Sequence, residues 1–292
     1  MLGIIRYRNI VDPSTGPIIR LTSWKNDHNI LGEYYDSVAY LHPTLCIPKS
    51  TEIYANGAGG GASKFKIVAI QKAISEALER WAFFQLSVDS QAEQRRLGLD
   101  VDPTSTGFAC NPSLFEFKVR KKAKEEAIER WAVFNWWRNK LPIEIFLMSD
   151  DCVEFEIITP FLDIKVFVSA RRSLNGTYTY GFSASDRASY RREQAWIEQA
   201  RNIEALSRTS SNLNPLFIGD KRLLYFSKEI GFKDFLEKLK SSSTIHQIPE
   251  KPKILVDSEV KGPWSNYCRV WRTLFEGGET WQHSTDEKIF LF

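Results

Sequence analysis

The stretch KAISEALERWAFF, from Lys72 to Phe84, returns fifty residues later as KAKEEAIERWAVF, from Lys122 to Phe134. The two copies are identical at nine of thirteen positions, and the shared positions include two glutamates, the arginine and the tryptophan. Two unrelated helices seldom share acidic, basic and aromatic positions together. The repeat therefore predicts two long helices of one design.

Helix geometry gives each copy an acidic face and an apolar face. At about 100° per residue, Glu76, Glu79 and Arg80 share one side of the first helix, one turn beyond Lys72. The second helix repeats this acidic face with Lys122, Glu126, Glu129 and Arg130. The residues expected to face the core are Ile74, Ala77, Leu78 and Trp81 in the first helix and Ala127, Ile128 and Trp131 in the second.

The acidic faces have two interpretations. Glu76 before Arg80 and Glu126 before Arg130 form favourable i, i+4 pairs, each contributing about 0.2–0.5 kcal/mol on a solvated surface. Alternatively, the four glutamates converge on one cavity and bind magnesium, a hard cation that takes oxygen ligands and is usually shared with phosphates. Arginines in such a site would bind phosphate oxygens. The residues alone leave both interpretations open.

Two further segments could belong to the same site. Ala195–Arg201 weakly resembles the repeat and places Glu198 and Arg201 on one helix face. The run Asn56–Ser63 is so rich in glycine that a loop is expected, and it precedes the first helix, whose N-terminus favours anions. It is not a P-loop, because no Gly-Lys-Ser/Thr follows at the required spacing.

The rest of the chain alternates between strand and helix signals, which is typical of a mixed α and β protein. The three long helices are expected at about 64–89, 112–139 and 187–208, and a short one at Lys233–Leu239. The expected strands are Gly3–Val11, Pro17–Trp24, Ser37–Leu41, Thr51–Ala55, a short one within Asp102–Asn111, Ile143–Met148, Val153–Ile158, Ile164–Ala170, Thr177–Ser183, Ile254–Val256 and Cys268–Phe275.

Composition narrows the class of protein. The 39 basic and 36 acidic residues nearly balance, and no concentrated basic stripe of the kind that binds nucleic acid is present. No stretch reaches the roughly 18 apolar residues that cross a membrane, and the charged start MLGIIRYRNIVD is not typical of a signal peptide. The four cysteines contain no CxxC pair and are interpreted as buried apolar groups. We expect a cytoplasmic protein without a nucleic-acid or membrane partner.

These motifs in combination resemble the YcaO family, ATP-dependent proteins that activate backbone amides of peptides. The resemblance rests on GAGGGASK, on AISEALERWA, on STGFACNPSLFEF leading into AKEEAIERWAVFNWW, and on the segment from Tyr180 to Glu198. The opening GIIRYRNIVDPSTG is also similar to the start of family members. The resemblance implies one YcaO-like α+β domain over residues 1–292. Its mixed and antiparallel sheets would pack with three long helices that carry the Glu/Arg motifs.

The resemblance also implies a function. Family members bind ATP and Mg2+ and phosphorylate a backbone amide oxygen of a ribosomally made precursor peptide, leading to an azoline, a thioamide or an amidine. It implies a partner protein in a modification complex and leaves a homodimer open, and no catalytic residue is assigned. Carried over by position, the metal ligands would be Glu76, Glu79, Glu126 and Glu129, and the nucleotide-binding residues Arg80, Glu129, Arg130, Glu198 and Arg201.

Several positions depart from the family pattern. The departures are Lys72 for a small or hydroxyl residue, Lys122 and Arg201 for glutamines, Trp131 for aspartate, Ile203 for arginine and Ala62 for lysine. We expect Lys72 and Lys122, on the acidic faces, to take over part of the role of the cation. Either the chain is a divergent enzyme, or it is a non-catalytic subunit that binds a peptide or partner. A binding domain with merely solvated acidic helices is the third alternative.

Overall fold

The computed structural model describes residues 7, 9–28, 31–46, 58–112, 115–173, 176–209, 218–245, 247–278 and 286–290. The predicted strand Thr51–Ala55 and the first residues of Gly3–Val11 lie outside these ranges. The chain divides into two compact units. Residues 1–127 and 254–274 form the first, and residues 128–253 and 275–292 form the second. Helix α4 (Glu116–Trp137) begins in the first unit and ends in the second.

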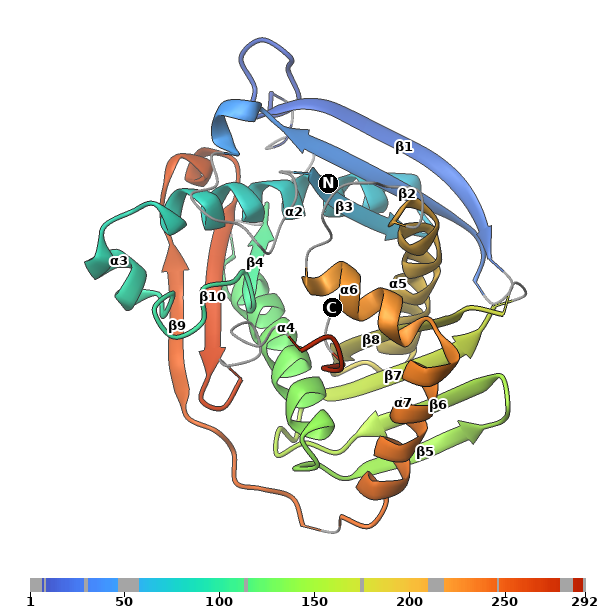
Figure 1. Ribbon diagram of the computed structural model, residues 1–292. Helices are drawn as coiled ribbons and strands as arrows, with labels where there is room; N and C mark the ends of the chain where they lie inside the picture. Colours follow the sequence, from blue (N-terminus) through green and yellow to red (C-terminus); the bar gives the residue numbers. More distant parts are fainter. Residues whose placement is uncertain are drawn as a thin grey trace. The chain divides into compact units, whose positions relative to one another are not determined.

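The first unit contains two small sheets and the helix that carries the first copy of the repeat (Figure 1). One sheet has the order β1-β2-β3 and is antiparallel, and the other has the order β4-β10-β9. Short helix α3 (Gln91–Arg96) follows α2, and 3-10 turns span Pro43–Leu45 and Pro263–Asn266. The remaining elements are β1 (Ile18–His28), β2 (Gly32–Leu41), β3 (Ala58–Ser63), α2 (Lys66–Ser87), β4 (Phe108–Asn111), β9 (Ile254–Val260) and β10 (Arg269–Phe275).

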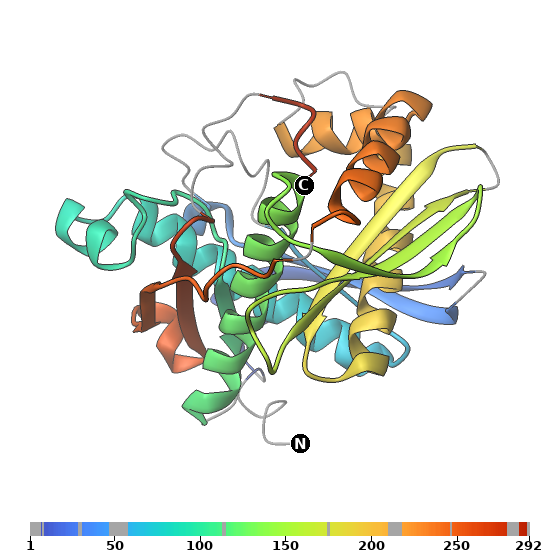
Figure 2. The ribbon, with the colours of Figure 1, turned by 90° about the horizontal axis from the view of Figure 1, so that it is seen from below.

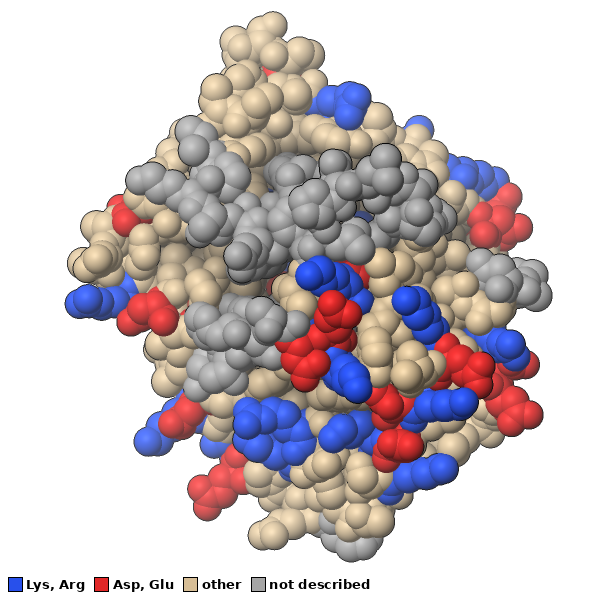
Figure 3. Space-filling model, in the orientation of Figure 1, with Lys and Arg blue, Asp and Glu red and all other residues tan. Residues whose placement is uncertain are grey.

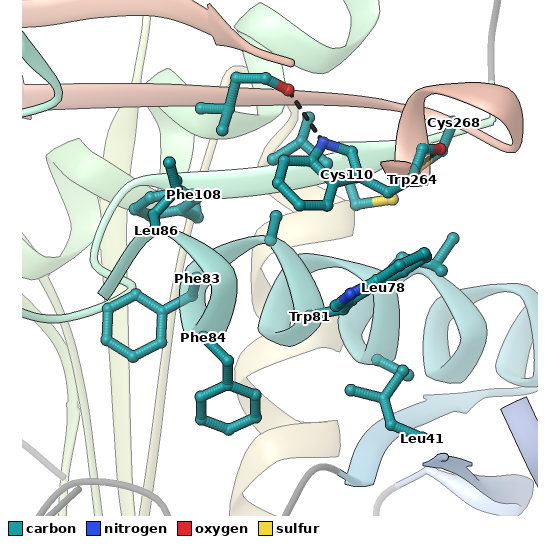
Figure 4. Close-up of a cluster of buried hydrophobic side chains, with 14 of the residues drawn as sticks. Leu41, Leu78, Trp81, Phe83, Phe84, Leu86, Phe108, Cys110, Trp264 and Cys268 are labelled. Atoms are coloured by element: carbon teal, nitrogen blue, oxygen red, sulfur yellow. Dashed lines mark hydrogen bonds between the residues drawn. The ribbon is translucent and has the colours of Figure 1, made fainter. Parts of the chain in front are cut away.

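Aromatic side chains of α2 join it to the second of these sheets and to the 3-10 turn between β9 and β10 (Figure 4). The Trp81 ring meets Trp264 edge-on at 5.8 Å, and Phe83 meets Phe108 at 6.0 Å. The Trp264 indole donates to the Val260 carbonyl at 2.9 Å, so this buried nitrogen keeps a partner. Edge-to-face pairs of this kind add about 0.5–1.5 kcal/mol to the area they bury. The apolar face of the repeat is therefore core, as its periodicity predicts.

The glycine-rich run differs from the loop that its composition predicts, because residues 58–63 form strand β3. The reason is a close approach of two backbones. A Cβ added at Gly59 would lie 2.1 Å from the Ala77 nitrogen, and one at Gly61 would lie 2.3 Å from the Ala69 oxygen. Glycine is thus required here for contact with α2 rather than for a turn.

The second unit is built on one antiparallel sheet with the order β5-β6-β7-β8 (Figure 2). Helix α5 packs on β7 and β8, and α6 lies next to α7. Helix α6 was not expected from the sequence, which shows only an apolar and basic stretch there. The elements are β5 (Ile143–Met148), β6 (Cys152–Ile157), β7 (Lys165–Arg172), β8 (Tyr178–Ser185), α5 (Ala188–Thr209), α6 (Ile218–Phe226) and α7 (Glu229–Ser242).

An aromatic cluster fills the core of the second unit. The rings of Trp136 and Phe235 lie 5.7 Å apart, and Tyr180 contacts both Phe235 and Phe290 at about 5 Å. The Tyr180 hydroxyl donates to the Phe226 carbonyl at 2.9 Å. Because alternate residues of a strand point to opposite faces, Tyr180 and Phe182 face this cluster and Gly181 faces α5.

The predicted fold class is confirmed: antiparallel sheets pack with three long helices that carry the Glu/Arg motifs, in an α+β arrangement. Among the described residues, no helix has the length and apolar character needed to cross a bilayer. On the face drawn in Figure 3, basic and acidic side chains are interspersed.

The close contact between β3 and α2 makes a testable prediction. Gly59→Ala should lower the free energy of unfolding by about 1–3 kcal/mol, because its methyl group cannot fit against the backbone of α2. Gly219→Ala is the control, since Gly219 lies in helix α6 with nothing within 4 Å of an added Cβ. Alanine there should leave stability unchanged or raise it by up to about 1 kcal/mol. Urea denaturation measures both, and equal effects would contradict the close packing.

Candidate functional site

Three side chains of α2, spaced four residues apart, bind three main-chain groups of β3. The Lys72 amine donates to the Ala62 carbonyl at 3.1 Å, and the Glu76 carboxylate accepts from the Gly60 N–H at 3.1 Å. Arg80 donates to the Ala58 carbonyl and, at 2.7 Å, to Glu76. Each step of four residues along the helix is matched by a step of two residues back along the strand. We call this row of contacts the α2–β3 clasp.

The clasp supplies hydrogen-bond partners to main-chain groups at the edge of a sheet. Strand β3 is the last strand of its sheet, so alternate main-chain groups point away from β2. Unpaired groups on an edge cost free energy when they are shielded from water, and they invite other strands to pair. Lys72, Glu76 and Arg80 therefore have a structural task in the first unit. Two of these residues, Glu76 and Arg80, are among those proposed from the sequence as ligands.

A second feature of the first unit is a buried carboxylate beside another carboxylate. The Glu79 side chain is only 7% exposed, and burial raises its pKa well above the usual range. The negative charge of Glu126 raises the pKa further, whereas the positive charge of Lys122 lowers it. The structure thus brings Glu79, Glu126 and Lys122 together from the two copies of the repeat. The two carboxylates favour a cation near them, and Lys122 supplies one positive charge.

In the second unit, glutamates of two helices bind main-chain groups of the edge strand β8. The Glu198 carboxylate of α5 accepts from the Phe182 N–H at 2.7 Å, and the Asn202 amide donates to the Tyr180 carbonyl at 2.8 Å. Glu129 of α4 accepts from the Ala184 N–H at 3.0 Å. Helix α5 therefore holds β8 as α2 holds β3. We call these contacts of α5 the α5–β8 clasp.

The two clasps correspond residue by residue at a constant separation of 122 positions. The hydrogen bond from the Gly60 N–H to Glu76 corresponds to the one from the Phe182 N–H to Glu198. In each clasp a second side chain donates to the strand carbonyl two residues before that N–H: Arg80 donates to Ala58, and Asn202 donates to Tyr180. The glycine that touches the helix also corresponds: a Cβ at Gly181 would lie 1.9 Å from the Ala195 oxygen.

Sequence reasoning matched the third helix to the first two but missed this register and missed Asn202. A signal for it exists in the sequence. Five identities share the separation of 122 positions: Gly59 with Gly181, Ala62 with Ala184, Ser63 with Ser185, Ala73 with Ala195, and Glu76 with Glu198. They are spread over strand and helix, so a search within helices alone does not find them.

Two arginines, Arg130 and Arg201, lie near Glu198. Its desolvation raises the pKa of the carboxyl to about 7, while Arg130, the Phe182 N–H and Arg201 act in the opposite direction. The Arg130 guanidinium also lies 5.5 Å from the centre of the Phe182 ring. Of the nucleotide-binding residues expected from the sequence, Glu198, Arg130 and Arg201 are thus neighbours within the second unit.

Three departures from the family pattern have defined neighbours in the structure. Trp131 is buried, its indole donates to the Glu276 carbonyl at 3.0 Å, and its ring meets Phe161 at 5.6 Å. It therefore anchors the turn that follows β10. Lys72 is part of the α2–β3 clasp, whereas Lys122 acts on the Glu79 carboxylate. The two lysines occupy equivalent positions of the repeat and have different neighbours.

A metal site made of protein groups alone is not found in the described part of the chain. No group of three or more His, Cys, Asp and Glu side chains in those residues could hold an ion. Magnesium is usually bound by one or two carboxylates together with phosphate oxygens and water. The pair Glu79 and Glu126 fits that smaller requirement.

One solved structure with a similar fold is a YcaO from Methanopyrus kandleri bound with AMPPCP and Mg2+. The match has a TM-score of 0.57 and covers 99% of this chain and 92% of that chain, at 12% sequence identity. The chain has a YcaO-like fold. No family model matches the sequence, and no curated protein does. At this identity the YcaO-like fold is what the match shows.

The α2–β3 clasp predicts a difference between two lysines of one helix. Lys72→Ala should remove the bond to Ala62 and weaken β3 by about 1 kcal/mol, so its amides should exchange about fivefold faster with deuterium. Lys66→Ala, at an exposed position in the first turn of α2, should leave this exchange unchanged. Equal exchange in both variants, followed by mass spectrometry, would contradict the clasp.

Glu198 predicts a pH dependence of stability. Its carboxyl keeps a proton up to about pH 7 in the folded chain but only to about 4.5 when unfolded. The folded state therefore loses stability as pH rises from 4.5 through 7. Between pH 5 and pH 8 the free energy of unfolding should fall less in Glu198→Gln than in the wild type. Glu237→Gln, exposed on α7, should behave as the wild type does. Parallel curves for Glu198→Gln and the wild type would contradict this assignment.

Proposed function

We propose that this chain binds ATP with magnesium and activates a backbone amide of a peptide by phosphorylating its oxygen. The observation that carries the proposal is that the buried Glu79 of α2 lies close enough to the half-buried Glu126 of α4 for the two carboxylates to repel each other, within a YcaO-like fold. A solved YcaO with that fold holds AMPPCP and Mg2+, which supports the choice of ligands.

The cation is proposed to lie against carboxylates of the repeat. Glu79 and Glu126 are the first candidates because their mutual repulsion in a dry environment is relieved by positive charge. Glu129 is a further candidate, and its carboxylate is already oriented by the Ala184 N–H. Glu76 stays among the proposed metal ligands, but it would have to give up its bonds to Gly60 and Arg80 to bind the metal.

The phosphate groups are proposed to bind basic side chains. Arg130 and Arg201 lie close enough to Glu198 to lower the pKa of its carboxyl, so they bring positive charge to one place in the second unit. A guanidinium matches phosphate oxygens in geometry and stays charged at every relevant pH. Arg80 is the weaker candidate, because it donates to Ala58 and Glu76 in the clasp.

The chemistry would be phosphoryl transfer by positioning and charge stabilisation. Bound ATP would supply the phosphoryl group, and the protein would orient the peptide amide and keep water away. A side-chain hydroxyl or thiol of the peptide would then attack the activated amide carbon, and loss of the phosphorylated oxygen as phosphate would give an azoline; sulfide or an amine attacking the same carbon would give a thioamide or an amidine. We propose a ribosomally made precursor peptide as substrate, a partner protein of a modification complex, and a single YcaO-like domain comprising both units.

A second candidate function is a non-catalytic subunit that binds the peptide or a partner. The observation that favours it is Lys122, whose charge already acts on the Glu79 carboxylate. A lysine at that place reduces the need for a cation. The two functions differ in whether nucleotide binds, so they can be separated by direct measurement.

Isothermal titration calorimetry with a non-hydrolysable ATP analogue tests the main proposal. Wild-type protein should bind in the presence of magnesium, and Glu79→Gln and Glu129→Gln should each weaken binding by about tenfold or more, because a ligand and its neutralising charge are lost. The matched control is Glu237→Gln on the exposed face of α7, which should bind as the wild type does. No nucleotide binding by the wild type, with or without peptide, would support the subunit function instead.

Lys122→Met gives a second test. If Lys122 replaces part of the charge of the cation, the variant should bind nucleotide more weakly at low magnesium and recover at high magnesium, so its magnesium dependence should be steeper than that of the wild type. Lys66→Met, at an exposed position of α2, is the control. Tighter binding in Lys122→Met at every magnesium concentration would show that the lysine obstructs the site.

A further inference from the structure

The first half of helix α4 carries an unfavourable arrangement of charge. The eight residues from Phe117 to Lys124 include five basic ones: Lys118, Arg120, Lys121, Lys122 and Lys124. Lys118 stands in the first turn, where the helix dipole disfavours positive charge. Lys121 lies three residues from both Lys118 and Lys124, so it is a neighbour of each on the helix surface and repels both. A bound anion would relieve these repulsions.

Only some of these basic side chains are neutralised within the chain. Arg120 donates to the Asp257 carboxylate at 2.9 Å, and the charge of Lys122 acts on Glu79. Lys121 reaches the Glu125 carboxylate only at 3.9 Å. Among the residues that the structure describes, no acidic side chain forms an ion pair with two of the five: Lys118 and Lys124. Positive charge on this part of α4 therefore exceeds the negative charge that the chain provides.

Exposed aromatic side chains lie beside these lysines. Phe117 is 64% exposed and Phe115 is 59% exposed, and their ring centres lie 5.8 Å apart. The Lys118 ammonium lies 5.7 Å from the centre of the Phe115 ring. Aromatic side chains are enriched in the interfaces between proteins, and exposed apolar groups that cluster mark such contacts. The surface thus offers both positive charge and apolar contact area.

We propose that this surface binds an acidic segment of a polypeptide partner. It consists of Phe117, Lys118, Lys121 and Lys124, and we call it the basic face of α4. At about 100° per residue, Phe117, Lys121 and Lys124 span about 60° of the helix circumference, and Glu126 projects from the opposite side. The proposal is therefore independent of the carboxylates assigned to the cation, and it does not require nucleotide binding.

The charges that flank the basic face favour a peptide over a uniform polyanion. Glu116 precedes the face along the helix and Glu125 follows it. These two carboxylates would repel the closely spaced phosphates of a nucleic acid or of an anionic bilayer, which cannot avoid them. A peptide can place its carboxylates opposite the lysines and an apolar side chain against Phe117. The face thus fits an acidic segment that also carries an aromatic or aliphatic residue.

Fluorescence anisotropy at low salt, with a labelled peptide of repeating Glu-Glu-Phe, tests the proposal. The wild type should bind this peptide. The double variant Lys118→Gln, Lys124→Gln should bind it about fivefold more weakly because two charge contacts are lost, and Phe117→Ala should have an effect of similar size. Lys66→Gln and Phe65→Ala, at exposed positions where α2 begins, are the controls and should bind as the wild type does. Absence of binding by the wild type, or equal binding by all variants, would overturn the proposal.

The same assay with other ligands distinguishes the classes of partner. A peptide of repeating Lys-Lys-Phe should not bind, and a peptide of glutamate alone should bind more weakly than Glu-Glu-Phe because it lacks the apolar contact. A single-stranded oligonucleotide, or vesicles that contain phosphatidylserine, should also bind more weakly than Glu-Glu-Phe. Tighter binding of either one, lost in the double variant, would assign the face to nucleic acid or to lipid and overturn the peptide assignment.

Thermal unfolding tests whether the lysines oppose their own helix. The double variant Lys118→Gln, Lys124→Gln should raise the Tm by about 1–3 °C, because repulsion within α4 is removed. Lys240→Gln is the contrast: Lys240 lies in the last turn of α7, where positive charge is favourable, so this variant should not raise the Tm. A lower Tm in the double variant would show that the two lysines stabilise α4, and it would overturn the proposal.

Discussion

The interaction on which much of the structure depends is the contact of a helix side chain with the open edge of a sheet. In each unit a glutamate of a long helix accepts a backbone N–H from the last strand, and a glycine one position earlier lets the two backbones approach. Without the glycine the helix could not lie so close, and without the glutamate the edge would keep an unsatisfied donor. Strand, glycine and glutamate are therefore needed together, which explains why they recur together.

The need to bind these sheet edges gives the glutamates two different roles. Glu76 and Glu198 orient edge strands, whereas Glu79 lies desolvated beside Glu126 and gains most from an added positive charge. A residue type alone does not show which task applies, since both groups consist of glutamates on helices of similar sequence. The proposed cation and nucleotide sites follow the second group and the arginines near Glu198.

Several features could be predicted from the sequence because they follow from local pattern. The apolar face of Lys72–Phe84 became core because periodicity reports burial directly, and the four strand segments predicted in residues 143–183 became an antiparallel sheet. The strand at residues 58–63 was missed because glycine usually marks turns, and only the contact with Ala73 and Ala77 explains it. The different roles of Lys72 and Lys122 could not be predicted either: their positions in the repeat are equivalent, and only tertiary contacts distinguish them.

The most direct measurement is a crystal structure of the protein with magnesium and a non-hydrolysable ATP analogue. We predict that the cation contacts Glu79 or Glu126 and that phosphate oxygens contact Arg130 or Arg201. The bonds from Gly60 to Glu76 and from Phe182 to Glu198 should persist in that complex. A structure in which Glu76, and neither Glu79 nor Glu126, binds the metal, or in which the nucleotide lies away from these residues, would contradict the division between clasp and ligand.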